Sequence, residues 1–207
     1  MRPIRTLVRF VCLFGVLYGL LIAPWPGWNS RYSQAFCYSC ERLLGAEGAD
    51  RIVRFERAPE GARLDTQIVL ADPRQLAPDG MVKARVLGLD SRGVGWVPTA
   101  LFSALVLATP VGWKRRLRSL AAGLLLMQAF IVLSVLAYIW NESLPATGPG
   151  ASLVGTLTKR IAEGLQLTLV TQIGASFAVP AILWLLVCFD RRDIEAAQRI
   201  LGERRDP

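Results

Sequence analysis

Four long runs of apolar residues, separated by polar segments, dominate the pattern of the chain. A run of about twenty mostly apolar residues can cross a hydrocarbon core about 30 Å thick as a helix. The first run is short for that task, so we expect Leu7 and Val8 to extend it. The pattern predicts a membrane α-helical protein with four transmembrane helices, at residues 10–25, 94–113, 120–140 and 165–189.

Basic residues precede the first run, as they do in a secretory signal peptide. Arg2, Arg5 and Arg9 come before it, and it ends in Ala-Pro-Trp-Pro-Gly-Trp. That ending lacks the small-x-small pattern of a cleavage site. Residues 1–25 are therefore predicted to remain as an N-terminal signal-anchor helix.

Residues 26–93 have the composition of a small water-soluble segment. Ser30 is a candidate N-cap for a helix to about Leu44, with an apolar face formed by Tyr32, Phe36, Cys40, Leu43 and Leu44. Glycines then end the helix. Three short runs rich in Val, Ile and Leu follow, with turn-forming residues between them, and predict a meander of strands at residues 51–57, 64–71 and 81–89. The segment is thus predicted to be a small α+β insertion between helices 1 and 2.

Arginine-rich segments set the expected orientation. With four spans, the N-terminus, the basic turn at residues 114–118 and the tail at 190–207 share one side of the membrane. Cytoplasmic loops are enriched in Lys and Arg, so this side is expected to be the cytoplasm. The prediction is a multi-pass protein of a bacterial inner membrane with both termini cytoplasmic. Segment 26–93 is then extracytoplasmic, and residues 94–189 form a three-helix transmembrane region.

Composition excludes several function classes. The net charge is +8, from 24 basic and 16 acidic residues, but the basic residues flank the apolar runs, and we expect no nucleic-acid partner. The chain has no histidine, the commonest general base and neutral metal ligand. No charged residue lies at the centre of a span, which argues against an ion-coupled transporter. We therefore predict no catalytic residues, no metal site and no cofactor, and a protein that is not an enzyme.

The Cys37-Tyr38-Ser39-Cys40 motif is the sharpest local signal. On a helix both sulfurs share one side, so the pair could exchange electrons with a client, form a structural disulfide, or simply pack. Four spans with a CxxC after the first resemble the quinone-coupled disulfide-forming oxidoreductases of the DsbB type. Those enzymes use a second extracytoplasmic cysteine pair, and residues 141–164 contain no cysteine. A structural or dispensable pair is the prediction, and a membrane thiol-disulfide oxidoreductase is the alternative.

Polar residues interrupt the fourth run. Between helices, such side chains usually form hydrogen-bonding contacts. We expect this role, rather than a cavity lining, for Gln166, Thr168, Thr171, Gln172 and Ser176.

A longer segment resembles a known family. Residues 90–118 read DSRGVGWVPTALFSALVLATPVGWKRRLR, and LDTQIVLADP stands upstream at residues 64–73. Together they resemble the exosortase H-associated membrane proteins over about residues 51–140. The resemblance implies an accessory of exosortase-linked envelope protein sorting, with an exosortase or another membrane protein as partner. Exosortases themselves use a Cys, an Arg and a His, and because this chain has no His, we do not expect that catalytic apparatus here.

Overall fold

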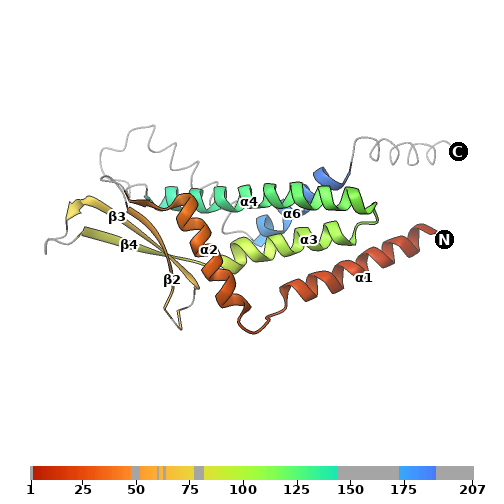
Figure 1. The fold of residues 1–207 in the computed structure, drawn as a ribbon, viewed down its shortest axis with the longest axis horizontal. Coiled ribbons are helices and arrows are strands. Elements are labelled where there is room, and N and C mark those ends of the chain that lie inside the picture. The colour runs from red at the N-terminus through yellow and green to blue at the C-terminus, as the bar shows by residue number, and fades with distance from the viewer. Residues whose placement is uncertain are drawn as a thin grey trace. The chain divides into compact units, whose positions relative to one another are not determined.

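Helices predominate in the structure, with one small antiparallel sheet (Figure 1). The computed structural model describes residues 2–47, 52–59, 61–62, 64–76, 82–143 and 173–189. The helices are α1 (Arg2–Ile22), α2 (Trp28–Leu44), the π-helix η1 (Arg92–Trp96), α3 (Val97–Ala108), α4 (Trp113–Ser143) and α6 (Ile173–Cys188). The strands are β1 (Ala46–Glu47), β2 (Ile52–Arg57), β3 (Thr66–Leu76) and β4 (Val82–Leu89).

The chain divides into two compact units. Unit 1 comprises residues 1–23, 98–130 and 174–207, and unit 2 comprises residues 24–97 and 131–173. Helix α4 is continuous and contributes to both. The units are described one at a time below.

Among the described residues, two helices are long and apolar enough to cross a membrane, Ile4–Ile22 and Trp113–Trp140. At 1.5 Å per residue, the first is about 29 Å long and the second about 42 Å. Two shorter apolar helices, Arg92–Ala108 and Ser176–Cys188, cover parts of the second and fourth predicted spans. Most of the polar residues expected on the fourth span lie outside the part of the chain that the structure describes, as does the tail.

The bend between α3 and α4 differs from the sequence expectation. Helix α3 ends at Ala108, residues 109–112 form the connection, and α4 begins at Trp113. The basic residues 114–118 thus form the first turns of a helix rather than the turn itself. The physical reason is local: Pro110 has no N–H to continue α3, whereas Lys and Arg are good helix formers.

Unit 1 has a small core at this end of the helices. Phe102 and Val106 of α3, Met127 of α4 and Cys188 of α6 are all buried together. Gly123 lets α4 approach α3 closely, because a Cβ at this position would overlap the ring of Phe102. The first turns of α4 also hold the end of α6. Ser119 Oγ donates to Val187 O at 2.9 Å, and Arg115 Nη2 donates to Cys188 O at 2.8 Å.

The sheet of unit 2 is an antiparallel meander in the order β1-β2-β3-β4, which confirms the predicted meander and adds the two-residue β1. Strand β3 is longer than expected and runs on to Leu76. Its register with β4 is irregular between Ala71 and Leu76, the stretch that contains Pro73. Proline cannot donate to a neighbouring strand, which fits a break in the register there.

One face of the sheet is buried under α2 (Figure 1). The inward residues alternate along each strand, as a half-buried sheet requires. They are Val53, Phe55, Thr66, Ile68, Leu70, Leu87 and Leu89. The paired registers place Val53 opposite Leu70 and Phe55 opposite Ile68.

Helix α2 differs from its prediction in two details. Its N-cap is Gly27, with φ +73°, and not Ser30, which lies inside the first turn. The left-handed conformation of Gly27 starts the helix three residues earlier. Leu43 was expected on the buried face but is 62% exposed. The buried face consists of Ser33, Phe36, Cys37 and Cys40. Gly45 ends the helix, as expected.

Candidate functional site

Both cysteines of the CxxC motif lie between α2 and the sheet. Cys37 is 8% exposed and Cys40 is 5% exposed, and both are free thiols. The Cys37 thiol lies 3.6 Å from Thr66 Oγ1 and 3.7 Å from Glu56 O, close enough to donate weakly to either. The helix therefore places both sulfurs on its buried side, as the three-residue spacing predicted.

Burial makes these thiols poor nucleophiles. It raises the pKa of Cys40 to about 12, with the neighbouring Cys37 adding to the effect. Burial also raises the pKa of Cys37, although its hydrogen bond with Thr66 opposes this. A reactive thiol needs the reverse, an exposed sulfur with a lowered pKa. The geometry favours a packing role for the pair.

Glu41, which directly follows Cys40 on α2, fixes the helix to the sheet. Its carboxylate accepts a hydrogen bond from the backbone N–H of Phe55 at 2.6 Å. A charge-assisted bond of this kind is stronger than a neutral one and specifies the register between helix and strand.

Asp65 joins two segments that are far apart in sequence. Its carboxylate accepts hydrogen bonds from Ser91 N at 2.8 Å and from Ser91 Oγ at 2.6 Å. Ser91 is fully buried and is the N-cap residue of η1. Asp65 belongs to LDTQIVLADP and Ser91 to DSRG, so the structure brings together the two segments that carry the family resemblance.

The π-helix η1 packs against the first turns of α2. The ring centroid of Tyr32 lies 5.5 Å from that of Trp96, and the ring centroid of Trp28 lies 5.1 Å from that of Trp96. Gly95 is required here because a Cβ would overlap the Tyr32 hydroxyl. No sequence pattern indicated a π-helix, because the extra residue per turn leaves no recognisable periodicity.

A polar hollow of about 330 Å³ lies beside the contact between Asp65 and Ser91, with Asp65 in its lining. It is bounded by the start of α2 and by the connection between β2 and β3. Its polar lining residues are Asn29, Ser30, Ser33, Arg57 and Asp65. Such a mixture of hydroxyl, amide and charged groups can bind a polar peptide segment. Within the described residues, no group of three or more Cys, Asp or Glu forms a possible metal site.

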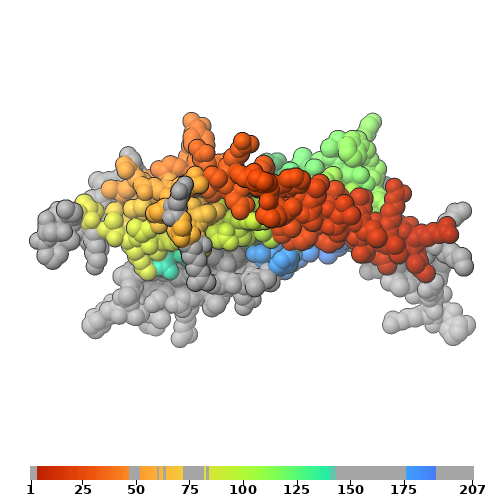
Figure 2. All heavy atoms as spheres, turned by 90° about the horizontal axis from the view of Figure 1, so that it is seen from below, coloured from red at the N-terminus to blue at the C-terminus, as the bar shows by residue number. Residues whose placement is uncertain are grey.

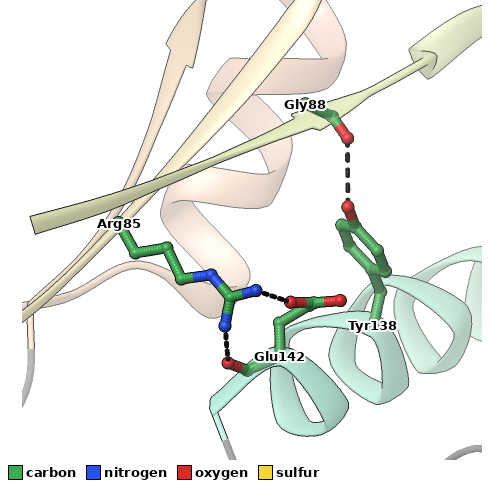
Figure 3. A network of polar contacts seen from close by, with 4 residues as sticks. All are labelled: Arg85, Gly88, Tyr138 and Glu142. Carbon is green, nitrogen blue, oxygen red and sulfur yellow. Dashed lines mark hydrogen bonds and ion pairs between the residues drawn. The ribbon is translucent and has the colours of Figure 1, made fainter.

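A separate group of polar contacts attaches β4 to the end of α4 (Figure 3). Arg85 pairs with the carboxylate of Glu142 and also donates to its backbone carbonyl, and Tyr138 Oη donates to Gly88 O at 3.2 Å. None of these residues stood out in the sequence, because ordinary charged and aromatic residues carry no signal of their partners.

Comparison of the chain with models of protein families, with curated proteins and with solved structures found no match. The resemblance to exosortase H-associated proteins therefore stays a prediction.

Proposed function

We propose that this chain is a non-enzymatic accessory protein of a bacterial inner membrane. It crosses the membrane four times, keeps both termini in the cytoplasm and holds residues 26–93 on the extracytoplasmic side. Through that segment and its helices it binds a partner membrane protein, an exosortase or a protein of the same envelope-sorting system.

The exposed apolar surface of the helices carries the membrane part of the proposal. On α1, Val16 is 69% exposed, and on α4 Leu125 is 74% exposed. Figure 2 shows α1 in red as an extended exposed ridge. Many of the neighbouring apolar side chains are also exposed, namely Ile4, Leu7, Val8, Val11, Leu20, Leu126, Leu133 and Leu136. Leaving apolar surface in water costs about 25 cal/mol per Å², whereas lipid removes that cost.

The solvated face of the sheet supports the placement of unit 2 in water. Arg54 and Glu56 are exposed on β2. They alternate with the buried Val53 and Phe55, so the outer face of β2 carries charged side chains while its inner face packs under α2. A segment built this way is suited to an aqueous compartment.

The accessory role is supported by two observations. The cysteines of the CxxC motif are buried with raised pKa values, which suits packing better than electron exchange. The sequence resemblance to exosortase H-associated proteins supplies the process and the class of partner.

Reporter fusions test the topology. Fusions at Arg116 and at the C-terminus should be active only as cytoplasmic reporters, and fusions at Gly61 and Gly148 only as extracytoplasmic ones. A cytoplasmic signal at Gly61 would refute the orientation.

Co-purification from native membranes tests the partner. An affinity-tagged chain should retain the host exosortase after mild detergent extraction. The R57E variant changes a polar residue of the hollow and should reduce recovery several-fold. R42E, on α2 outside the hollow, is the matched control and should retain it. Equal recovery of exosortase with an unrelated four-helix membrane protein would exclude specific binding.

A further inference from the structure

Two adjoining cavities in unit 1 lie between the first half of α1 and the bend that joins α3 to α4. The first, of about 500 Å³, is lined by three arginines, Arg5, Arg9 and Arg116, together with Phe10 and Pro110. The second, of about 460 Å³, shares Phe10 and Pro110 and is otherwise bounded mainly by apolar groups, Trp184 and Phe189 among them. A basic compartment thus borders an apolar one.

The arginines converge from two helices. Arg5 and Arg9 are four residues apart on α1 and therefore share a face. Arg116 reaches the same cavity from the second turn of α4. It is held in place by a 2.8 Å bond from Nη2 to Thr109 O and by its position 5.6 Å from the ring centre of Trp113. Its Nε is buried and has no hydrogen-bond partner among the described residues. A buried, charged donor of this kind requires an acceptor.

Among the described residues of unit 1, the charge is unbalanced. Residues 2–23, 98–130 and 174–189 of unit 1 contain basic residues but no Asp or Glu. Three guanidinium groups around one cavity repel each other, and an anion placed among them relieves that repulsion. Guanidinium groups match phosphate oxygens by paired hydrogen bonds.

We propose that the two cavities form a binding site for one anionic phospholipid, with its phosphate among Arg5, Arg9 and Arg116 and an acyl chain along Phe10 and Trp184. Basic pockets between transmembrane helices on the cytoplasmic side hold anionic headgroups in this manner. The apolar compartment favours a lipid over free phosphate, because only a lipid fills both. The inference rests on the membrane insertion proposed above.

Native mass spectrometry of the detergent-purified full chain tests the site. Dioleoyl phosphatidylglycerol should bind at least tenfold more tightly than dioleoyl phosphatidylcholine. Each basic residue near an anionic headgroup contributes about 1 kcal/mol, so R5Q/R9Q should lose roughly tenfold or more of that preference. R118Q removes an exposed charge from the same helix as Arg116, outside the cavity, and should keep it.

Three outcomes would overturn the site. They are equal binding of the two lipids, an equal loss in R118Q and R5Q/R9Q, and full competition by inorganic phosphate or glycerophosphoglycerol, which lack acyl chains. Alkaline carbonate extraction of membranes separates this failure from failure of the proposed function. A chain that stays in the membrane but shows no lipid preference refutes the site alone, whereas a chain released by carbonate refutes the membrane insertion as well.

Discussion

Arg85 on β4 and Glu142 near the end of α4 lie 57 positions apart in sequence, yet the arginine contacts the glutamate twice (Figure 3). Its Nη2 lies 2.5 Å from the carboxylate, and its Nη1 lies 2.9 Å from the backbone carbonyl. The Arg85 side chain is 62% exposed, so solvent screens the pair. The contact therefore orients α4 against the sheet more than it stabilises the fold.

Loss of this pair should have a small effect. R85A and E142A should each lower the free energy of unfolding by about 1 kcal/mol or less, as exposed ion pairs do. Thermal unfolding in detergent with a double-mutant cycle measures the coupling. A coupling energy that vanishes at low salt would show that the two side chains do not interact in solution.

Replacement of Gly123 should disturb the packing of α3 on α4. A methyl group at this position would overlap Phe102, so G123A should destabilise the protein by about 1–3 kcal/mol, the usual cost of overpacking. G15A and G19A are matched controls, because a Cβ at either position of α1 meets no other atom within 4 Å. Thermal unfolding of all three in one detergent provides the comparison. A loss shared by the controls would point to a general effect of removing glycine from helices.

Removal of the Asp65 carboxylate should weaken the joint between β3 and η1. D65A leaves the buried Ser91 N–H and hydroxyl without their acceptor, which costs about 1–3 kcal/mol for each unsatisfied group. D90A is the control, since Asp90 is exposed and its carboxylate accepts a hydrogen bond from the nearby Arg92 N–H. Limited proteolysis of membranes should cut unit 2 faster in D65A and at the native rate in D90A. Equal resistance of D65A would show that Asp65 does not hold the joint.

The raised pKa of Cys40 predicts slow alkylation and a specific pH dependence. With a pKa of about 12, roughly one Cys40 in ten thousand is a thiolate at pH 8. Iodoacetamide should therefore react far more slowly with the folded chain than with the unfolded one. The folded pKa lies above the unfolded value, so the stabilisation is present below about pH 9 and is lost as the pH rises towards 12. The stability of C37A/C40A should fall less over that range than that of the native chain.

Client oxidation separates a packing role from a redox role for the same pair. C37S/C40S should leave disulfide formation in other envelope proteins unchanged and should lower the stability of this chain only modestly. Fast alkylation at pH 8, or a mixed disulfide trapped between Cys37 and a client, would favour the oxidoreductase alternative.

Periodicity and composition determined the larger elements of this protein. The apolar runs marked where helices form, since helix-length hydrophobicity is a local property of consecutive residues. Alternation of apolar side chains identified the three main strands, and the three-residue spacing placed Cys37 and Cys40 on one side of α2.

Only the tertiary structure decided how these elements meet. It joined Asp65 to Ser91 and Arg85 to Glu142, buried the two thiols and raised their pKa values, and placed Gly95 and Gly123 where a side chain cannot fit. Sequence could not reveal these features, because hydrogen-bond partners, desolvation and close approach depend on residues brought together from distant parts of the chain. The same reason explains why Arg116 could be read as a topological charge but not as part of a cavity: its neighbours Arg5 and Arg9 are more than a hundred positions away.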